Sequence, residues 1–321
     1  MMEPTLRRTF EVCGEPELRG MHQPLVSVIV PTFNQRIGAV RAVQSALAQT
    51  YPRCEIIVQD DGSTDGTAEA VGSLSPAISC QIQEHRGLGT ARNNAIRRSR
   101  GELVALLDPD DVWTTDKLER CVGYLQARPD VDIVYSPTMP PTGEGECLAG
   151  WLLDELFDRN FIRDSAAVFH RRVWERVGGF DESLPLHVGH NFWVRAAVGQ
   201  RFGLVPEPLV HAGHQPVLSR NELAHRIRIQ VEMLYRFFEA QGGKERLDRF
   251  RAARTFARLG YAAGMRFLLE GDGTQAVRML YGALICRPTP WIRVLYYAAR
   301  LQRWWLNQPV YQEPPLVYVT C

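Results

Sequence analysis

The chain lacks an excess of basic charge. Its 37 lysine and arginine residues are balanced by 36 aspartate and glutamate residues, which leaves a formal net charge of +1. A protein that binds nucleic acid through its phosphates normally carries a clear basic excess. We therefore expect no nucleic-acid partner.

Membrane-spanning, secretory and disulfide signals are also missing. The chain has no run of about 18 apolar residues, the length that a spanning helix needs. Arg7 and Arg8 are not followed by the apolar segment of a signal peptide. The 7 cysteines are scattered without a Cys-x-x-Cys pair, and their odd number argues against a disulfide framework. We therefore expect a cytoplasmic protein, with contact to the inner face of the cell membrane left open.

Strands and helices alternate over the first half of the chain. Apolar runs predict strands over 26–30, 55–58, 78–82, 103–107 and 132–135. Helical spacing or capping predicts helices over 37–48, 65–74, 90–98 and 117–126. We expect Pro31 to end the first strand. Such alternation is typical of right-handed βαβ units and predicts an α/β fold with a mostly parallel sheet.

The pattern divides the chain into three parts. Residues 1–23 form a polar lead-in, and residues 24–218 form the α/β domain. Residues 219–321 are helical throughout, punctuated by glycine and proline pairs, and we expect three or four helices there.

The most informative segment is the acidic turn Asp108-Pro109-Asp110-Asp111, which directly follows an apolar strand. Three carboxylates that close repel one another unless a positive charge lies among them. Their hard oxygens suit Mg²⁺ or Mn²⁺, so Asp108, Asp110 and Asp111 are candidate metal ligands. The alternative is a solvated turn in which Asp110 or Asp111 caps the next helix.

Three other polar clusters follow predicted strands. They are Pro31-Thr32-Phe33-Asn34-Gln35, Asp60-Asp61-Gly62-Ser63-Thr64-Asp65, and Arg86 to Asn94, which includes Arg92. Each cluster alone is a common strand-to-helix turn. In parallel sheets, however, ligands bind beyond the carboxyl ends of the strands, and all four clusters fall there.

Taken together, the order and spacing of these clusters resemble family 2 glycosyltransferases of the GT-A fold. The resemblance is carried by Ser27 to Asn34, Ile56 to Asp65, Gly87 to Ala95 and Leu106 to Trp113. It is strong over residues 24–136 and weaker to about residue 218. It implies a GT-A domain that transfers a sugar from a nucleotide diphosphate donor, a UDP-sugar in our expectation, to an acceptor hydroxyl with inversion.

The resemblance also implies roles for single residues. Pro31, Thr32, Asn34, Asp60, Asp61 and Arg92 would bind the nucleotide sugar. Asp108 and Asp110 would form the DXD motif, which contacts the ribose and a metal that bridges the diphosphate. The acceptor would be a carbohydrate or a lipid-linked molecule in polysaccharide or glycoconjugate synthesis.

One departure from the family pattern concerns the general base. Inverting members usually carry a Glu-Asp pair shortly before Trp-x-Arg, and here Val188-Gly189 stands in that place before Trp193-Val194-Arg195. Three interpretations stay open. His187 or His190 is the base, Asp181 or Glu182 reaches the site after a loop shift, or the protein binds a nucleotide sugar with little or no turnover.

An aromatic and basic segment lies near the C-terminus. It contains Trp291, Arg293, Tyr296, Tyr297, Arg300, Arg303, Trp304 and Trp305. This composition suits a helix that lies on an anionic membrane surface. The alternative is a terminal helix that docks its aromatic side chains onto the catalytic domain.

Overall fold

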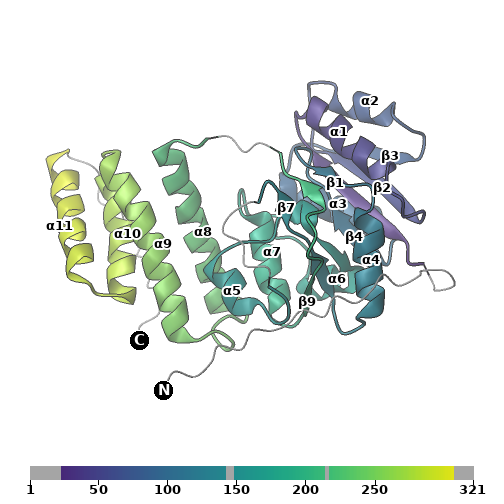
Figure 1. The fold of residues 1–321 in the computed structure, drawn as a ribbon. Coiled ribbons are helices and arrows are strands. Elements are labelled where there is room, and N and C mark those ends of the chain that lie inside the picture. The colour runs from purple at the N-terminus through teal and green to yellow at the C-terminus, as the bar shows by residue number, and fades with distance from the viewer. Residues whose placement is uncertain (1–22, 142–147, 214–216, 307–321) are drawn as a thin grey trace, which may run out of the picture.

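A seven-stranded sheet forms the centre of the N-terminal half (Figure 1). The computed structural model describes residues 23–141, 148–213 and 217–306, so the expected lead-in lies outside the described residues except for its last position. In spatial order the strands are β3 (Ile78–Ile82), β2 (Cys54–Asp60), β1 (Val26–Thr32), β4 (Leu103–Leu106), β8 (Val168–His170), β6 (Ile133–Tyr135) and β9 (Phe202–Leu204). Only the two pairings made by β8, with β4 and β6, are antiparallel. The α/β fold with a mostly parallel sheet is therefore confirmed.

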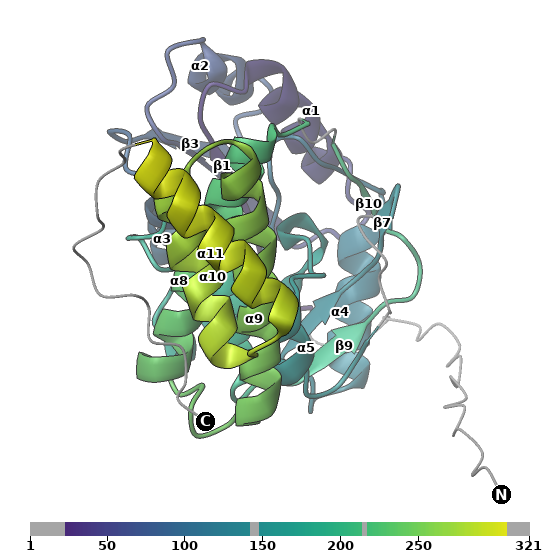
Figure 2. The ribbon, with the colours of Figure 1, turned by 90° about the vertical axis from the view of Figure 1, so that its left-hand side faces the viewer.

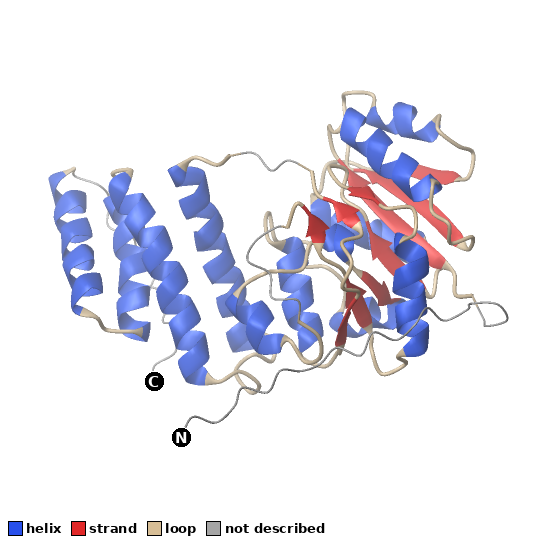
Figure 3. Cartoon of the chain, in the orientation of Figure 1, coloured by secondary structure: helices blue, strands red, loops and turns tan. Residues whose placement is uncertain are grey.

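Helices cover both faces of this sheet, as Figure 3 shows by colour. They are α1 (Arg36–Leu47), α2 (Thr67–Gly72), α3 (Leu88–Arg98), α4 (Lys117–Ala127), α5 (Leu153–Asp158), α6 (Arg171–Val177) and α7 (Val188–Ala197). Alternate residues of β1 enter different cores. Val28 packs in the cluster that contains Val43 of α1, whereas Ile29 packs in the cluster that contains Ala95 of α3. Burial on both faces explains why β1 is a continuous apolar run.

The first strand does not end at Pro31, as we expected, but continues to Thr32. Proline has no N–H to donate, so it is tolerated only where no neighbouring strand needs that donor. The carbonyl of Ile29 accepts a hydrogen bond from Leu107, just beyond β4. Pro31 lies two residues later and faces the same side, where β4 has already ended at Leu106.

A small second sheet was not predicted from the sequence. It consists of β5 (Val112–Trp113), β10 (Val210–His211) and β7 (Thr138–Met139). Because β5 follows the acidic turn directly, the next helix begins only at Lys117, with Asp116 in front of it. The alternative in which Asp110 or Asp111 caps that helix is therefore wrong.

Four helices follow the α/β part within the described residues, in agreement with the expected helical region. They are α8 (Arg220–Ala240), α9 (Arg249–Leu269), α10 (Gly273–Cys286) and α11 (Pro290–Trp305). Figures 1 and 2 show them as a row beside the α/β part, with α11 outermost. The division of the chain near residue 218 stays a prediction.

One hydrophobic core joins the helical row to the α/β part. Phe157 of α5 lies 6.2 Å from Phe237, 6.4 Å from Phe238 and 5.6 Å from Phe256, measured between ring centroids. All four side chains are fully buried. The first two of these helices are therefore packed against the α/β part rather than merely tethered to it.

We predict that Phe157→Ala lowers the free energy of unfolding by about 3–5 kcal/mol, because it leaves a cavity at this junction. Phe250→Ala is the matched control, since Phe250 is 72% exposed. Denaturant unfolding followed by circular dichroism measures both variants. Equal midpoints for the two variants would show that the junction contributes nothing to stability.

Candidate functional site

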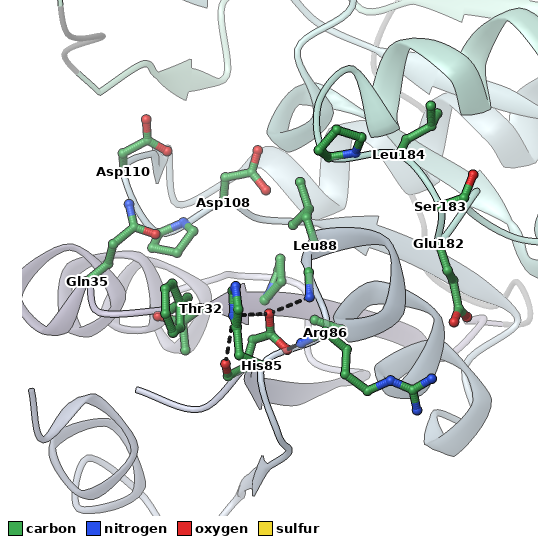
Figure 4. A pocket seen from close by; sticks show the side chains of 17 residues that line it. Thr32, Gln35, His85, Arg86, Leu88, Asp108, Asp110, Glu182, Ser183 and Leu184 are labelled. Atoms are coloured by element: carbon green, nitrogen blue, oxygen red, sulfur yellow. Dashed lines mark hydrogen bonds and ion pairs between the residues drawn. The ribbon is translucent and has the colours of Figure 1, made fainter. Parts of the chain in front are cut away.

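A pocket of about 740 Å³ opens at the carboxyl edge of the parallel strands. Residues of all four predicted clusters line it, together with the segment 182–185 that precedes α7. In Figure 4 the carboxylates of Asp108 and Asp110 lie on one side of the pocket and Glu182 on another. The edge of the sheet thus brings together residues that are far apart in the sequence, as expected.

Asp61 organises the loop after β3. Its carboxylate accepts hydrogen bonds from the backbone N–H groups of Arg86 (2.9 Å) and Gly87 (2.8 Å), and from the side chain of Gln83 (2.7 Å). The Nδ1 atom of His85 lies 2.9 Å from the same carboxylate. Asp61 is buried and lines the pocket, so its main effect is to hold the pocket wall in place.

Two buried oxygens at this edge have no hydrogen-bond partner among the described residues. They are Thr32 Oγ1 and Asp60 Oδ2. The other oxygen of Asp60 accepts from the backbone N–H of Ser63 at 2.6 Å. Buried polar atoms without partners are costly, so both positions favour a bound molecule with matching polar groups.

An aromatic pair stands beside these atoms. The rings of Phe33 and His85 stack with centroids 4.1 Å apart, and both residues line the pocket.

Asn34 connects two loops. Its Oδ1 accepts from the backbone N–H of Thr64 at 2.8 Å, and its own backbone N–H donates to the hydroxyl of Ser63. Asn34 has a positive φ of 51°. The pocket lining includes Pro31 and Thr32 but not Asn34 or Asp60.

Arg92 is fully buried between two carboxylates. Its guanidinium donates to Asp108 at 2.7 Å and to Asp164 at 2.6 Å. Burial alone would lower the pKa of Arg92, but the two aspartates outweigh it and raise that pKa further. The two terminal nitrogens of Arg92 are used within the wall, whereas its Nε has no hydrogen-bond partner among the described residues. Arg92 does not line the pocket, so direct contact with the nucleotide stays a prediction.

The pKa of Asp108 is raised in spite of its ion pair with Arg92. Burial raises its pKa to about 6, against the opposing effect of Arg92, and the charges of Asp164 and Asp111 add to the rise. Burial and Asp111 also raise the pKa of Asp110. Both side chains line the pocket, and a cation placed there would relieve this repulsion.

Asp111 is a structural residue. It is fully buried, and both of its oxygens accept from Arg163, at 2.6 and 2.7 Å. The backbone N–H of Gly213 donates to it as well, at 2.9 Å. Asp111 does not line the pocket, so the expectation that it binds a metal does not fit its surroundings.

Residues 163–165 enclose the acidic turn, and sequence reasoning missed them. Arg163 binds Asp111 and lies 3.2 Å from Asp110, Asp164 shares Arg92 with Asp108, and Ser165 Oγ accepts from the N–H of Asp108 at 2.9 Å. The four carboxylates and two guanidinium groups of this cluster leave an excess of two negative charges. In the part of the chain that the structure describes, no group of three or more His, Cys, Asp or Glu side chains is arranged to hold a metal ion.

The structure brings neither candidate histidine into the pocket lining. His190 is 1% exposed, and its Nε2 lies 2.7 Å from the carbonyl oxygen of Leu156. Burial lowers its pKa to about 4. His187 lies 3.0 Å from the carbonyl oxygen of Arg226, and burial lowers its pKa too. Both imidazoles hold backbone carbonyls rather than face a substrate.

The acidic alternatives lie closer to the pocket. Glu182 lines it, but its carboxylate accepts from Asn93 at 2.8 Å and from Thr90 at 3.2 Å, and these bonds tie it to α3. The hydrogen bond from Asn93 is the largest of the effects that lower its pKa. Asp181 accepts from the backbone and the hydroxyl of Ser183.

A family model described as "Glycosyl transferase family 2" matches residues 27–170. Residues 27–170 form a family 2 glycosyltransferase domain. This finding confirms the resemblance seen in the sequence. The match ends at the last residue of β8, so it includes the acidic turn and residues 163–165 but not α7.

Curated relatives agree with this assignment. The chondroitin synthase of Escherichia coli is 29% identical over 180 residues, which are 54% of this chain and 26% of that protein. The putative teichuronic acid biosynthesis glycosyltransferase TuaG of Bacillus subtilis is 39% identical over 110 residues, or 33% of this chain and 44% of TuaG. The chain therefore matches less than half the length of either relative.

Solved glycosyltransferase structures share the fold over most of the chain. TarS of S. aureus (1–349, in complex with UDP) has a TM-score of 0.60 at 17% identity. The matched part is 90% of this chain and 93% of the TarS chain. The mannosyltransferase PcManGT of Pyrobaculum calidifontis, in complex with GDP-Man and Mn²⁺, has a TM-score of 0.61 at 22% identity, with coverages of 94% and 92%. The GT-A-like fold is thereby confirmed.

We predict that Arg92→Met lowers the free energy of unfolding by about 3–5 kcal/mol, because Asp108 and Asp164 lose their shared buried cation. Arg97→Met on the same helix is the control, since the Arg97 side chain is 53% exposed. We expect this control to change stability by about 1 kcal/mol or less. Thermal unfolding compares the two, and similar losses would contradict the shared-cation interpretation.

We predict that His190 makes the fold sensitive to mild acid. Its pKa is lowered from 6.5 to about 4, so below pH 6.5 the unfolded chain binds a proton that the folded chain refuses. The contribution of neutral His190 to the free energy of unfolding is fully present above pH 6.5. It falls as the pH drops toward 4, by up to about 3 kcal/mol. His190→Gln should reduce this loss, as measured by urea unfolding at pH 7 and pH 4.5. Identical pH dependence in both proteins would contradict the prediction.

Proposed function

We propose that this protein transfers a sugar from a nucleotide diphosphate donor, a UDP-sugar, to an acceptor hydroxyl with inversion, using Mn²⁺ or Mg²⁺. The observation that carries this proposal is the convergence of four polar strand ends on one pocket, with an acidic turn at its rim. In the family, synthesis of polysaccharides and glycoconjugates uses this reaction. A carbohydrate or lipid-linked acceptor fits the polysaccharide relatives.

The nucleoside would occupy the side of the pocket near β1 and β2. Thr32 Oγ1 would supply a polar partner for a base or a ribose from the pocket lining, and Asp60 Oδ2 would supply another, although Asp60 itself does not line the pocket. The stacked rings of Phe33 and His85 offer an aromatic surface at the same side. TarS in complex with UDP supports a uridine nucleotide, and PcManGT with GDP-Man keeps guanosine as an alternative.

The metal would be held by Asp108 and Asp110. Their carboxylates are hard oxygen ligands, and both side chains line the pocket. The surrounding cluster carries an excess of two negative charges, which a divalent cation would balance. Asp111 would act behind them, because its two bonds to Arg163 fix the turn. A divalent ion in this place would neutralise the charge that develops on the leaving diphosphate.

The chain's own residues would then orient the reactants. Arg92 holds the Asp108 carboxylate at a fixed position, and Arg163 does the same for Asp110 from the other side. Leu184 and Pro185 also line the pocket and would exclude water from a bound sugar. An in-line displacement in such a pocket needs no covalent intermediate.

A second candidate function is nucleotide-sugar binding with little or no turnover. Val188-Gly189 favours it, because no acidic side chain stands at the position where family members usually carry one. This candidate predicts tight UDP binding without sugar transfer or hydrolysis.

Membrane contact through the C-terminal helices stays a proposal. Trp291, Tyr297, Trp304 and Trp305 of α11 are 58–81% exposed, so they do not dock onto the α/β part as one alternative predicted. Arg293, Arg300 and Arg303 lie on the same helix and suit an anionic surface. Within residues 23–306, gaps excepted, no helix combines the length and the apolarity needed to cross a membrane. We propose a cytoplasmic location at the inner face of the membrane.

The experiment is a turnover screen with UDP-, GDP- and dTDP-sugars in the presence of Mn²⁺. We predict that Asp110→Asn lowers the rate by at least about 100-fold, because the diphosphate loses its metal-mediated stabilisation. Asp130→Asn is the control, since Asp130 is an exposed carboxylate paired with Arg201. Wild-type protein that binds UDP tightly but turns over no donor would favour the second candidate instead.

A further inference from the structure

The space beside Gly189 is already occupied by a carboxylate. A Cβ atom at Gly189 would lie 2.1 Å and 2.2 Å from the two carboxylate oxygens of Asp164. No real Cβ contact is this short, so any side chain at position 189 would have to displace Asp164. The position where the family pattern expects an acidic side chain is thus glycine, and an acidic side chain from another segment lies against it.

Asp164 reaches this place because of the sheet topology. It begins the short 3₁₀ turn Asp164–Ala166, directly before β8. Since β8 runs antiparallel to β4, the start of β8 lies beside the end of β4, where the acidic turn begins. Gly189 approaches from α7, of which it is the second residue.

The carboxylate of Asp164 is held firmly by two donors. Oδ2 accepts from Arg92 at 2.6 Å, and Oδ1 accepts from the indole N–H of Trp193 at 2.8 Å. Through Arg92 it is connected to Asp108, which lines the pocket. Its side chain is 14% exposed, whereas Arg92 and Trp193 are fully buried.

The surroundings of the Asp164 carboxylate combine a shared cation, a helix N-terminus and free acceptor positions. Asp164 shares one guanidinium with Asp108, so neither aspartate is fully neutralised. The first turn of α7 lies against it, and the partial positive charge of a helix N-terminus favours an anion. Each carboxylate oxygen of Asp164 uses one lone pair, in its bond to Arg92 or to Trp193, and keeps another for a further donor.

We propose that Asp164 supplies the carboxylate that removes the proton from the acceptor hydroxyl, in place of the acidic pair absent at Val188-Gly189. This proposal rests on the proposed function. The acceptor oxygen forms a bond to the anomeric carbon of the sugar while the bond from that carbon to the diphosphate oxygen breaks. The hydroxyl proton goes to Asp164, and the electron pair of the broken bond leaves with the diphosphate.

The assignment removes the need for a catalytic histidine. His187 and His190 are each bound to a backbone carbonyl. Asp164, which is also absent from the pocket lining, is instead linked through Arg92 to Asp108 at the rim of the pocket. It also explains why α7 keeps Trp193, whose indole N–H holds the carboxylate, although its usual acidic residues are missing.

The first test is Asp164→Asn, which keeps the shape of the side chain and an acceptor for Trp193. We expect kcat with the best UDP-sugar of the screen to fall by at least about 100-fold. The KM for that donor should stay within about threefold, because Arg92 keeps its own bond to Asp108, which lines the donor pocket. Asp132→Asn is the matched control, since Asp132 also pairs with an arginine and its side chain is 15% exposed.

A structural role of Asp164 gives a different result. In that case Asp164→Asn raises KM or lowers the melting temperature while kcat stays near the wild-type value, and the proposal is overturned. UDP binding by calorimetry and thermal unfolding separate these effects from misfolding.

The second test moves the carboxylate back to α7. Gly189→Asp alone should lower both stability and kcat, because two carboxylates compete for one space. Asp164→Gly alone should lower kcat as the asparagine variant does. The double variant Asp164→Gly/Gly189→Asp should recover at least about tenfold in kcat over Asp164→Gly. A double variant that folds and binds UDP but is no faster than Asp164→Gly overturns the proposal.

The two proposals fail in different ways. If the wild-type protein turns over no UDP-, GDP- or dTDP-sugar, the proposed function fails and the base assignment falls with it. If the wild-type protein is active and Asp164→Asn keeps its kcat, only the assignment of Asp164 fails.

Discussion

Charge compensation at one edge of the sheet is the constraint on which this site depends. Asp108, Asp110 and Asp111 follow a buried strand, where like charges would repel one another. Arg92 and Arg163, two buried or nearly buried guanidinium groups, hold them in place. The compensation is incomplete, because three carboxylates face two guanidinium groups, and Asp164 adds a fourth carboxylate to the cluster. The fold thereby keeps a fixed negative charge at the rim of its pocket, and the proposed divalent cation would neutralise it.

The topology explains why this cluster can form. Parallel strands β1, β2 and β4 place their carboxyl ends at one edge, and the loops after them supply polar side chains. The antiparallel strand β8 brings the start of its own segment to the same edge. A catalytic carboxylate could therefore be supplied either from α7 or from the segment before β8. In this chain Gly189 leaves that space open, and Asp164 fills it.

The sequence predicted most of the sheet and the clusters at its edge, because apolar runs and polar turns are local signals. It did not predict that β1 continues through Pro31, since this depends on where the neighbouring strand ends. It also missed the small sheet, whose strands are two residues long. The partners of Arg92 and the role of residues 163–165 depend on contacts between distant segments. The one local sign was the absence of an acidic pair at Val188-Gly189, which left the identity of the general base open.

The central claim is that Asp108 and Asp110 bind a divalent ion that holds the donor diphosphate. Crystals of the protein soaked with UDP and Mn²⁺ test it most directly, through anomalous diffraction at the manganese absorption edge. The account predicts one anomalous peak between the carboxylates of the acidic turn and the diphosphate of bound UDP. UDP bound in the pocket without a manganese peak beside the acidic turn would contradict it.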